Sequence, residues 1–201
     1  MIAVIDYGVG NLFSLTASLK YIGAETIVTN KKEEILAADK IILPGVGAFE
    51  DAIEKLKNTG LVETIVSETK KGKPLLGICL GMQLLFEKSV EYGEHEGLGL
   101  IPGEIASIED DLSCELKVPH IGWNSISIKD DPLFKYIKNG EYVYYVHSFY
   151  GRKCEKNTIA TSEYGITITG AVRSGSVYGT QFHPEKSGQT GLNILRAFEE
   201  L

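Results

Sequence analysis

Cysteine is scarce in this sequence of 201 residues, which contains only Cys79, Cys114 and Cys154. The number is odd and no Cys-x-x-Cys pair occurs, so the sequence indicates neither a disulfide framework nor a zinc site, and we expect no metal. A cysteine that neither forms a disulfide nor binds zinc remains available as a reduced thiol.

Basic residues are also few, with 20 Lys and Arg against 27 Asp and Glu and a net charge of -7. They are scattered along the chain, whereas a nucleic-acid-binding surface gathers Lys and Arg into clusters. We therefore expect no nucleic-acid partner.

Long apolar runs are missing as well, since none approaches the ~20 residues that cross a bilayer. The first residues lack the basic start and cleavage site of a signal peptide. We therefore expect a cytoplasmic protein without membrane contact. With 43% hydrophobic residues, the chain suits one domain, residues 1–201, that is large enough to bury a full core.

The first half of the chain alternates short apolar runs with helical patterns. Strands are expected at 2–5, 26–29, 40–43 and 75–78, and helices at 12–22, 49–56, 61–71 and 80–86. This alternation predicts βαβ units and a parallel sheet with helices on both faces. Because ligands bind beyond the carboxyl ends of such strands, residues 6–11, residues 44–47 and the turn at Cys79 should open on one edge of the sheet.

The second half is richer in strands. Glycines at 93, 97, 99 and 103 break the helical period, and strands are expected at 104–108, 125–128, 142–146, 158–162, 166–172 and 177–181. A last helix is expected at 190–200. The fold class is therefore α/β, with a mostly parallel central sheet that an antiparallel, β-rich C-terminal half extends.

Cys79 lies between a predicted strand and a predicted helix, with Gly77 and Gly81 two residues away on either side. This pattern is typical of a nucleophile elbow, whose central residue has a strained backbone and whose glycines let strand and helix pass closely. At a helix N-terminus we expect the pKa of the thiol to fall. The alternative is a buried structural cysteine.

A cysteine nucleophile needs a base and a group that orients the base. His183 follows a predicted strand, and Glu185, two residues later in extended backbone, should project to the same side. The alternative is a strand-end turn with an exposed carboxylate. Among the other histidines, His95 is expected in a solvated loop, whereas His120 and His147 are either structural or in contact with a ligand.

The order of these motifs resembles the class I glutamine amidotransferases, whose Cys, His and Glu occur in this order. The resemblance narrows to the glutaminase subunits of imidazole glycerol phosphate synthases, the lyase of histidine biosynthesis. The motifs that carry it are DYGVGN at 6–11, PGVGAF at 44–49, GICLGMQ at 77–83, VPHIGWN at 118–124, YVHSFY at 145–150 and HPE at 183–185. They run in order along the whole chain.

The resemblance implies a flavodoxin-like fold and a glutaminase with Cys79, His183 and Glu185 as catalytic triad. It implies an oxyanion hole formed by the backbone amides of Val46 and Leu80, in which the Val46 amide must turn inward. The residues implied in glutamine binding are Gly47, Gln83, His147, Ser148 and Phe149. No cofactor is implied, and Gly8-Val9-Gly10 lacks the remaining residues of a phosphate-binding loop.

The implied partner is a (β/α)₈-barrel cyclase subunit that receives the ammonia within a heterodimer. Asn11 and an exposed patch of Pro119, His120 and Trp123 are expected at the interface, and the alternative for Trp123 is core packing. Two other functions stay open: the glutaminase component of an anthranilate, aminodeoxychorismate or guanylate synthase, and a catalytically silent flavodoxin-like module. The motifs at 6–11 and 118–124 argue against the former, and the intact triad argues against the latter.

Overall fold

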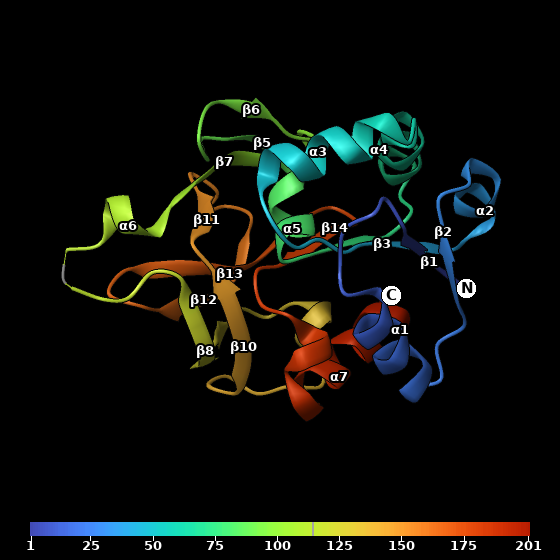
Figure 1. The fold of residues 1–201 in the computed structure, drawn as a ribbon. Helices are drawn as coiled ribbons and strands as arrows, with labels where there is room; N and C mark the ends of the chain where they lie inside the picture. The colour runs from blue at the N-terminus through green and yellow to red at the C-terminus, as the bar shows by residue number, and fades with distance from the viewer. Residues whose placement is uncertain (114) are drawn as a thin grey trace.

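A central sheet lies between two layers of helices (Figure 1). The computed structural model describes residues 1–113 and 115–201, so Cys114 lies outside the described residues. Its largest sheet has eight strands in the order β2-β1-β3-β4-β14-β13-β12-β9. The first five are parallel and the others antiparallel, which confirms the predicted α/β class.

The parallel part of the sheet follows the predicted alternation of strands and helices. Its strands are β1 (Ile2–Ile5), β2 (Thr26–Thr29), β3 (Lys40–Leu43), β4 (Leu75–Ile78) and β14 (Val177–Thr180). The helices are α1 (Leu12–Tyr21), α2 (Lys32–Ala37), α3 (Phe49–Asn58), α4 (Val62–Lys70), α5 (Leu80–Leu84) and α7 (Gly188–Glu199). α2 was not predicted, because six residues are too few to show a helical period.

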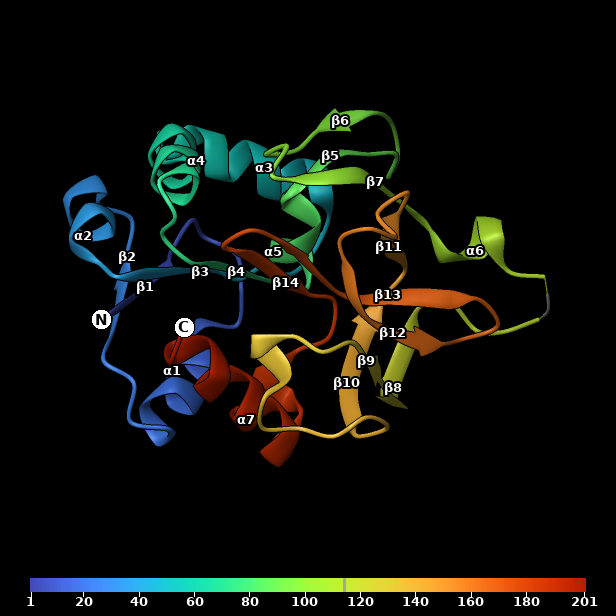
Figure 2. The same ribbon diagram turned by 180° about the vertical axis from the view of Figure 1, so that it is seen from behind.

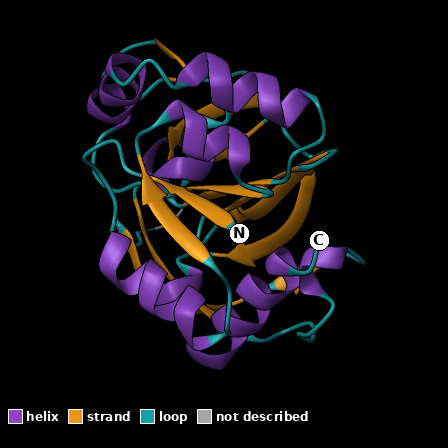
Figure 3. Ribbon diagram, turned by 90° about the vertical axis from the view of Figure 1, so that its right-hand side faces the viewer, coloured by secondary structure: helices purple, strands orange, loops and turns teal. Residues whose placement is uncertain are grey.

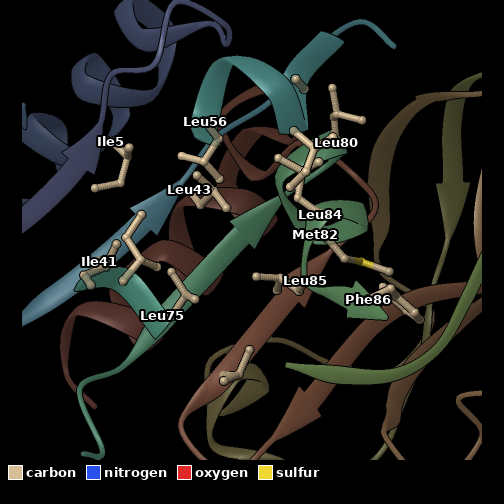
Figure 4. Close-up of a cluster of buried hydrophobic side chains, with 14 of the residues drawn as sticks. Ile5, Ile41, Leu43, Leu56, Leu75, Leu80, Met82, Leu84, Leu85 and Phe86 are labelled. Carbon is tan, nitrogen blue, oxygen red and sulfur yellow. The ribbon is translucent and has the colours of Figure 1, made fainter. Parts of the chain in front are cut away.

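Helices cover both faces of the parallel strands, as Figure 3 shows from the side. Side chains alternate between the faces of a strand. Ala3 and Ile5 therefore pack with α2, α3 and α4, whereas Ile2 and Val4 pack with α1 and α7. Figure 4 shows the first of these cores, in which Leu80 and Met82 of α5 lie beside the strand residues. The sheet is thus held rigidly from both sides.

The β-rich half extends the central sheet, as predicted, but it also contributes strands to two further sheets that were not predicted. β9 (Ser127–Ile128), β12 (Thr158–Glu163) and β13 (Thr167–Ser174) do extend that sheet. β8 (His120–Ser125) and β10 (Tyr142–His147) form an antiparallel pair beside β12 (Figure 2). β5 (Phe86–Ser89), β6 (His95–Glu96), β7 (Ile101–Ser107) and β11 (Phe149–Arg152) form a four-stranded sheet. The chain changes sheet at Ser148, between β10 and β11.

The helix predicted at 80–86 is shorter than expected. α5 ends at Leu84, and Phe86 begins β5 by pairing with Ile101 of β7. This pairing involves residues far apart in the sequence, so the local apolar pattern did not reveal it. The remaining short elements are α6 (Ile108–Asp111), η1 (Pro132–Phe134) and η2 (Pro184–Lys186). None of the described helices has the length and apolar character needed to cross a membrane.

Candidate active site

The segments after β1, β3 and β4 meet at one edge of the sheet, as the sequence predicted, and the segment after β14 lies at the same edge. Tyr7, after β1, donates a hydrogen bond from Oη to the carbonyl oxygen of Pro44, after β3, at 2.7 Å. The next residue, Gly45, packs so closely on the elbow that a Cβ there would lie 2.6 Å from the amide nitrogen of Gly81. The loop of residues 44–47 is therefore pressed against the turn that carries Cys79.

Cys79 has the strained backbone expected of a nucleophile elbow, with φ +54° and ψ -112°. The flanking glycines are needed for space: a Cβ at Gly77 would lie 2.6 Å from the carbonyl oxygen of Gly81, and one at Gly81 would collide with the carbonyl of Leu43. The Cys79 amide donates to the carbonyl oxygen of Thr180 at 2.7 Å, which fixes the turn to β14.

His183 and Glu185 form a buried pair directly after β14. The Nδ1 atom of His183 lies 2.7 Å from Oε1 of Glu185, and the two side chains are only 2% and 3% exposed. A carboxylate only accepts hydrogen bonds, so Nδ1 carries a proton. This burial excludes the alternative of a turn with an exposed carboxylate. The opposite nitrogen, Nε2, is buried and has no hydrogen-bond partner among the described residues.

Charge favours the protonated form of His183. Burial alone would lower its pKa, but interactions with the Cys79 thiolate and the Glu185 carboxylate outweigh this effect and raise the pKa to about 10. A thiolate at Cys79 and an imidazolium at His183 therefore stabilise each other. This arrangement supplies a nucleophile and a proton donor in the same place.

Cys79 and His183 line a cavity of about 440 Å³ at the edge of the sheet. The predicted oxyanion residues Val46 and Leu80 line it too. So do all the residues predicted to bind glutamine: Gly47, Gln83, His147, Ser148 and Phe149. Leu80 begins α5, so its N–H has no acceptor within the helix. The structure thus brings these predicted site residues around one cavity.

Several residues of this cavity were missed in the sequence. Glu91, Tyr92, Val146 and Lys186 belong to its lining. Glu91 is buried, accepts a hydrogen bond from the Phe49 amide at 2.9 Å, and has its pKa raised by burial. No local pattern marks these positions, because Glu91 and Tyr92 reach the cavity from the end of β5, Val146 from β10 and Lys186 from η2.

The predicted interface residues divide into exposed and buried ones. Trp123 is 56% exposed and Pro119 is exposed, so Trp123 is not core packing. The expectation of an exposed His120 was wrong, because its side chain points inward from β8 and is only 3% exposed. Asn11 is half-buried and caps α1 by accepting a hydrogen bond from the Ser14 amide.

His95 is also not the solvated loop residue that we expected. It lies in β6, half-buried, with its ring centroid 6.5 Å from that of Phe49 and Nδ1 3.8 Å from a Glu50 carboxylate oxygen. The β5–β6 pairing brings it against α3. Its acidic neighbours in the sequence gave the wrong indication.

A larger cavity, of about 600 Å³, lies away from the triad. Arg152, in its wall, is paired with Glu104 and Asp111. Cys154 is buried there, and burial raises the pKa of its thiol, so it has the character of a structural cysteine. Within residues 1–113 and 115–201, no group of three or more His, Cys, Asp or Glu side chains is placed to hold a metal ion.

Comparisons with known proteins agree with this geometry. Residues 3–200 match the family model described as glutamine amidotransferase class-I. The imidazole glycerol phosphate synthase subunit HisH of Caldanaerobacter subterraneus subsp. tengcongensis is 52% identical, over 100% of this chain and 98% of the relative. The subunit of the same name from Bacillus cereus (strain G9842) is 51% identical, over 99% of this chain and 94% of the relative.

Solved structures share the fold at low identity. A structure described as a glutamine amidotransferase has a TM-score of 0.78 at 19% identity and covers 100% of this chain and 98% of its own. PurLQS from Thermotoga maritima has a TM-score of 0.73 at 19% identity, over 98% of this chain and 96% of its own. The chain belongs to the class I glutamine amidotransferase family and, within it, to the imidazole glycerol phosphate synthase subunits HisH.

Proposed function

We propose that this chain is the glutaminase subunit of an imidazole glycerol phosphate synthase, and that it hydrolyses L-glutamine to L-glutamate and ammonia. One observation supports the proposed hydrolysis of glutamine more than any other. The strained Cys79 and His183, whose ring is paired with the buried Glu185, line a cavity large enough for an amino acid. The family and the full-length identity to HisH subunits support the place of this reaction in histidine biosynthesis.

The reaction begins with a thiolate at Cys79 and a proton on His183. The sulfur attacks the side-chain carboxamide carbon of glutamine to give a tetrahedral intermediate. The carbon–nitrogen bond then breaks, and His183 gives its Nε2 proton to the leaving nitrogen, so ammonia departs and a glutamyl thioester remains. Water attacks the thioester while His183 takes a proton from it. The carbon–sulfur bond then breaks, and glutamate is released with the Cys79 thiolate and the protonated His183 restored. Glu185 orients the imidazole throughout and stabilises its charged form.

The developing oxyanion needs two donors. The amide of Leu80, directly after the nucleophile, is one, because it is free of helical hydrogen bonds. The second is the amide of Val46, which reaches the oxyanion when the loop of residues 44–47 turns it inward. Loss of one such donor typically costs about 10²–10³ in rate, so this loop is a place where the reaction is switched.

Glutamine lies with its amino acid end between Glu91 and the β10–β11 turn. The Glu91 carboxylate is the acidic group of the cavity lining and suits the ammonium group of the substrate. Gln83 uses Nε2 to donate to the carbonyl oxygen of Phe149 and to Oε1 of Gln181, both at 3.0 Å. Both hydrogens of that amide are thereby used, so Gln83 offers glutamine only its Oε1 acceptor.

The ammonia passes to a (β/α)₈-barrel cyclase subunit, which makes imidazole glycerol phosphate and aminoimidazole carboxamide ribonucleotide. The exposed side chains Ile121 and Trp123 on β8, together with Pro119 at the cavity rim, support an interface on this side of the molecule. Asn11 fixes the start of α1 at the neighbouring edge. The two subunits form a heterodimer.

Glutamate release tests the proposal directly. We expect little release from the chain alone and strong stimulation by the cyclase subunit with its phosphorylated substrate. Stimulation by a chorismate-using partner instead would identify a different synthase. Absence of glutamate under every condition would leave a catalytically silent module.

The Cys79→Ala variant separates hydrolysis from ammonia delivery. We expect it to abolish glutamine-dependent synthesis, because the proposed mechanism forms the thioester on Cys79, while the complex still works with added ammonium salts. Loss of both activities would contradict ammonia delivery. Both reactions are followed by formation of the cyclase products.

A further inference from the structure

Two buried histidines outside the triad face each other across the β8–β10 pair. His120 and His147 are directly opposite in the strand register, and their rings are joined by a contact of 3.0 Å between Nδ1 of His120 and Nε2 of His147. Both side chains are almost fully buried. Neither takes part in the chemistry of the triad, so their buried polar atoms need another explanation.

The partners of these rings fix which nitrogens carry protons. Nδ1 of His147 lies 2.8 Å from the carbonyl oxygen of Phe149, which only accepts, so Nδ1 holds the proton and Nε2 accepts from Nδ1 of His120. Nε2 of His120 is left as an acceptor, and the side-chain amide of Asn124 lies 3.3 Å from it. From Asn124 through His120 and His147, each group therefore donates to the next, and the series ends at the carbonyl oxygen of Phe149.

This assignment requires two neutral rings, and burial favours that state. It lowers the pKa of His120 to about 4. It also lowers the pKa of His147, to about 3, although the hydrogen bond to Phe149 acts in the opposite direction. A proton on either ring would place two donors face to face.

The hydrogen bonds continue from Phe149 to the nucleophile. The same carbonyl oxygen accepts from Nε2 of Gln83, which also contacts Oε1 of Gln181. Nε2 of Gln181 in turn lies 3.8 Å from Sγ of Cys79. Gln181 is fully buried directly after β14. A continuous polar chain thus runs from β8 through the glutamine cavity to the thiol.

Strand β8, which carries His120, also carries the exposed apolar side chains Ile121 and Trp123. Because side chains alternate along β8, His120 and Asn124 point inward while Ile121 and Trp123, which are 58% and 56% exposed, point outward. A partner that binds the outer face of β8 therefore contacts the strand that carries His120, the first histidine of this series of hydrogen bonds.

We propose that His120 is a positioning residue for glutamine binding, which acts through His147 on the Phe149 carbonyl and Gln83 and connects the outer face of β8 with the cavity. This inference rests on the proposed function, because it concerns how the same cavity holds glutamine. It assigns His120 an active role in place of the exposed interface role expected from the sequence.

The competing role is packing alone. The His120 ring is stacked on Tyr145 and Tyr164, with centroid distances of 4.7 and 4.1 Å. Packing needs a flat ring, whereas positioning needs a donor at Nδ1. His120→Phe keeps the ring and removes the donor. His120→Asn removes the ring and keeps an amide donor near the place of Nδ1.

The experiment measures KM for glutamine and kcat of the wild-type and variant complexes with the cyclase subunit. We expect His120→Phe to raise KM about tenfold, because it leaves the acceptor of His147 unpaired, and to change kcat by less than about threefold. His120→Asn should keep KM within about threefold of the wild type. A larger increase of KM in His120→Asn than in His120→Phe overturns the proposal, and so does an unchanged KM in His120→Phe. Absence of glutamine hydrolysis in the wild type would refute the proposed function instead.

A second measurement does not depend on how the variants fold. Nitrogen-15 NMR of the wild-type protein at neutral pH distinguishes the tautomers of neutral histidines. We expect both His120 and His147 to carry the proton on Nδ1. A proton on Nε2 of either ring overturns the assigned direction of the chain, and with it the proposal.

Discussion

Glu185 is the group through which charge acts on His183 in the proposed triad. Its carboxylate is buried and held 2.7 Å from His183, and together with the Cys79 thiolate it offsets the effect of burial on the imidazole. Without these negative charges, burial would lower the pKa of His183 and favour a neutral ring. The protonated form of His183, which the leaving nitrogen needs, therefore depends on its neighbours.

The Glu185→Gln variant removes this charge and keeps the size of the side chain. We expect kcat for glutamine hydrolysis to fall by about 10²–10⁴, because the imidazolium loses its stabilising partner. Synthesis from added ammonium salts by the complex should stay within about twofold, since that route does not use the triad. A glutaminase rate close to that of the wild type would show that Glu185 does not support His183. Steady-state rates with both nitrogen sources give the answer.

The sequence alone predicted those site residues that are marked by the residues next to them in the chain. Gly77 and Gly81 marked Cys79 as the strained turn, and His183 and Glu185 were linked by their spacing. Glu91 was missed because only the folded sheets bring it to the cavity, and Gln181 because only the fold brings it beside Gln83 and Cys79. His120 was placed on the wrong face because the strand that carries it, β8, was not predicted.

The loop of residues 44–47 is held at its start by an element from another part of the chain. Tyr7 is buried, and its hydroxyl donates to the Pro44 carbonyl, while Val46 and Gly47 further along the loop are exposed. The loop is thus fixed at one end and free at the other. This division suits an amide that turns at Val46 while Gly45 stays packed on the elbow.

Tyr7→Phe removes only the hydroxyl that fixes the loop. We expect kcat for glutamine to fall about three- to tenfold with KM nearly unchanged, because a looser loop presents the Val46 amide less often, and stability to fall by about 1 kcal/mol. Tyr150→Phe is the matched control, since its hydroxyl contacts Asp111, away from the cavity. An equal loss of kcat in both variants would assign the effect to stability. Glutaminase kinetics and urea unfolding are measured on each.

The parallel strands could be predicted because they are short apolar runs between helical patterns, and β1 and β4 are buried at every position. In the β-rich half, the strands predicted at 142–146, 158–162 and 166–172 are confirmed as β10, β12 and β13. Their arrangement could not be predicted, because the strands of this half are shared among three sheets by long-range pairing. β10 and β11 follow each other after a single residue, yet β10 pairs with β8 and β11 with β7. No local pattern records such a choice of partner.

The molecule as a whole encloses its polar chain between the central sheet and the β8–β10 pair, and this has a consequence for stability in acid. A histidine that is neutral in the folded protein gains a proton on unfolding once the pH falls below about 6.5. The unfolded state is then favoured. The pKa of His147 is lowered to about 3, chiefly by burial, so its contribution to stability is complete above pH 6.5 and declines as the pH falls toward 3.

We therefore expect the wild-type protein to lose stability between pH 7 and pH 5, with about 2 kcal/mol of the loss due to His147. His147→Asn keeps a donor for the Phe149 carbonyl but has no group that titrates in this range. The variant should lose less unfolding free energy than the wild type between pH 7 and pH 5, and the difference should be about 2 kcal/mol. Urea unfolding of both proteins at pH 7 and pH 5 measures the difference. Equal losses would mean that His147 is protonated in the folded protein, which would also remove the acceptor that His120 needs.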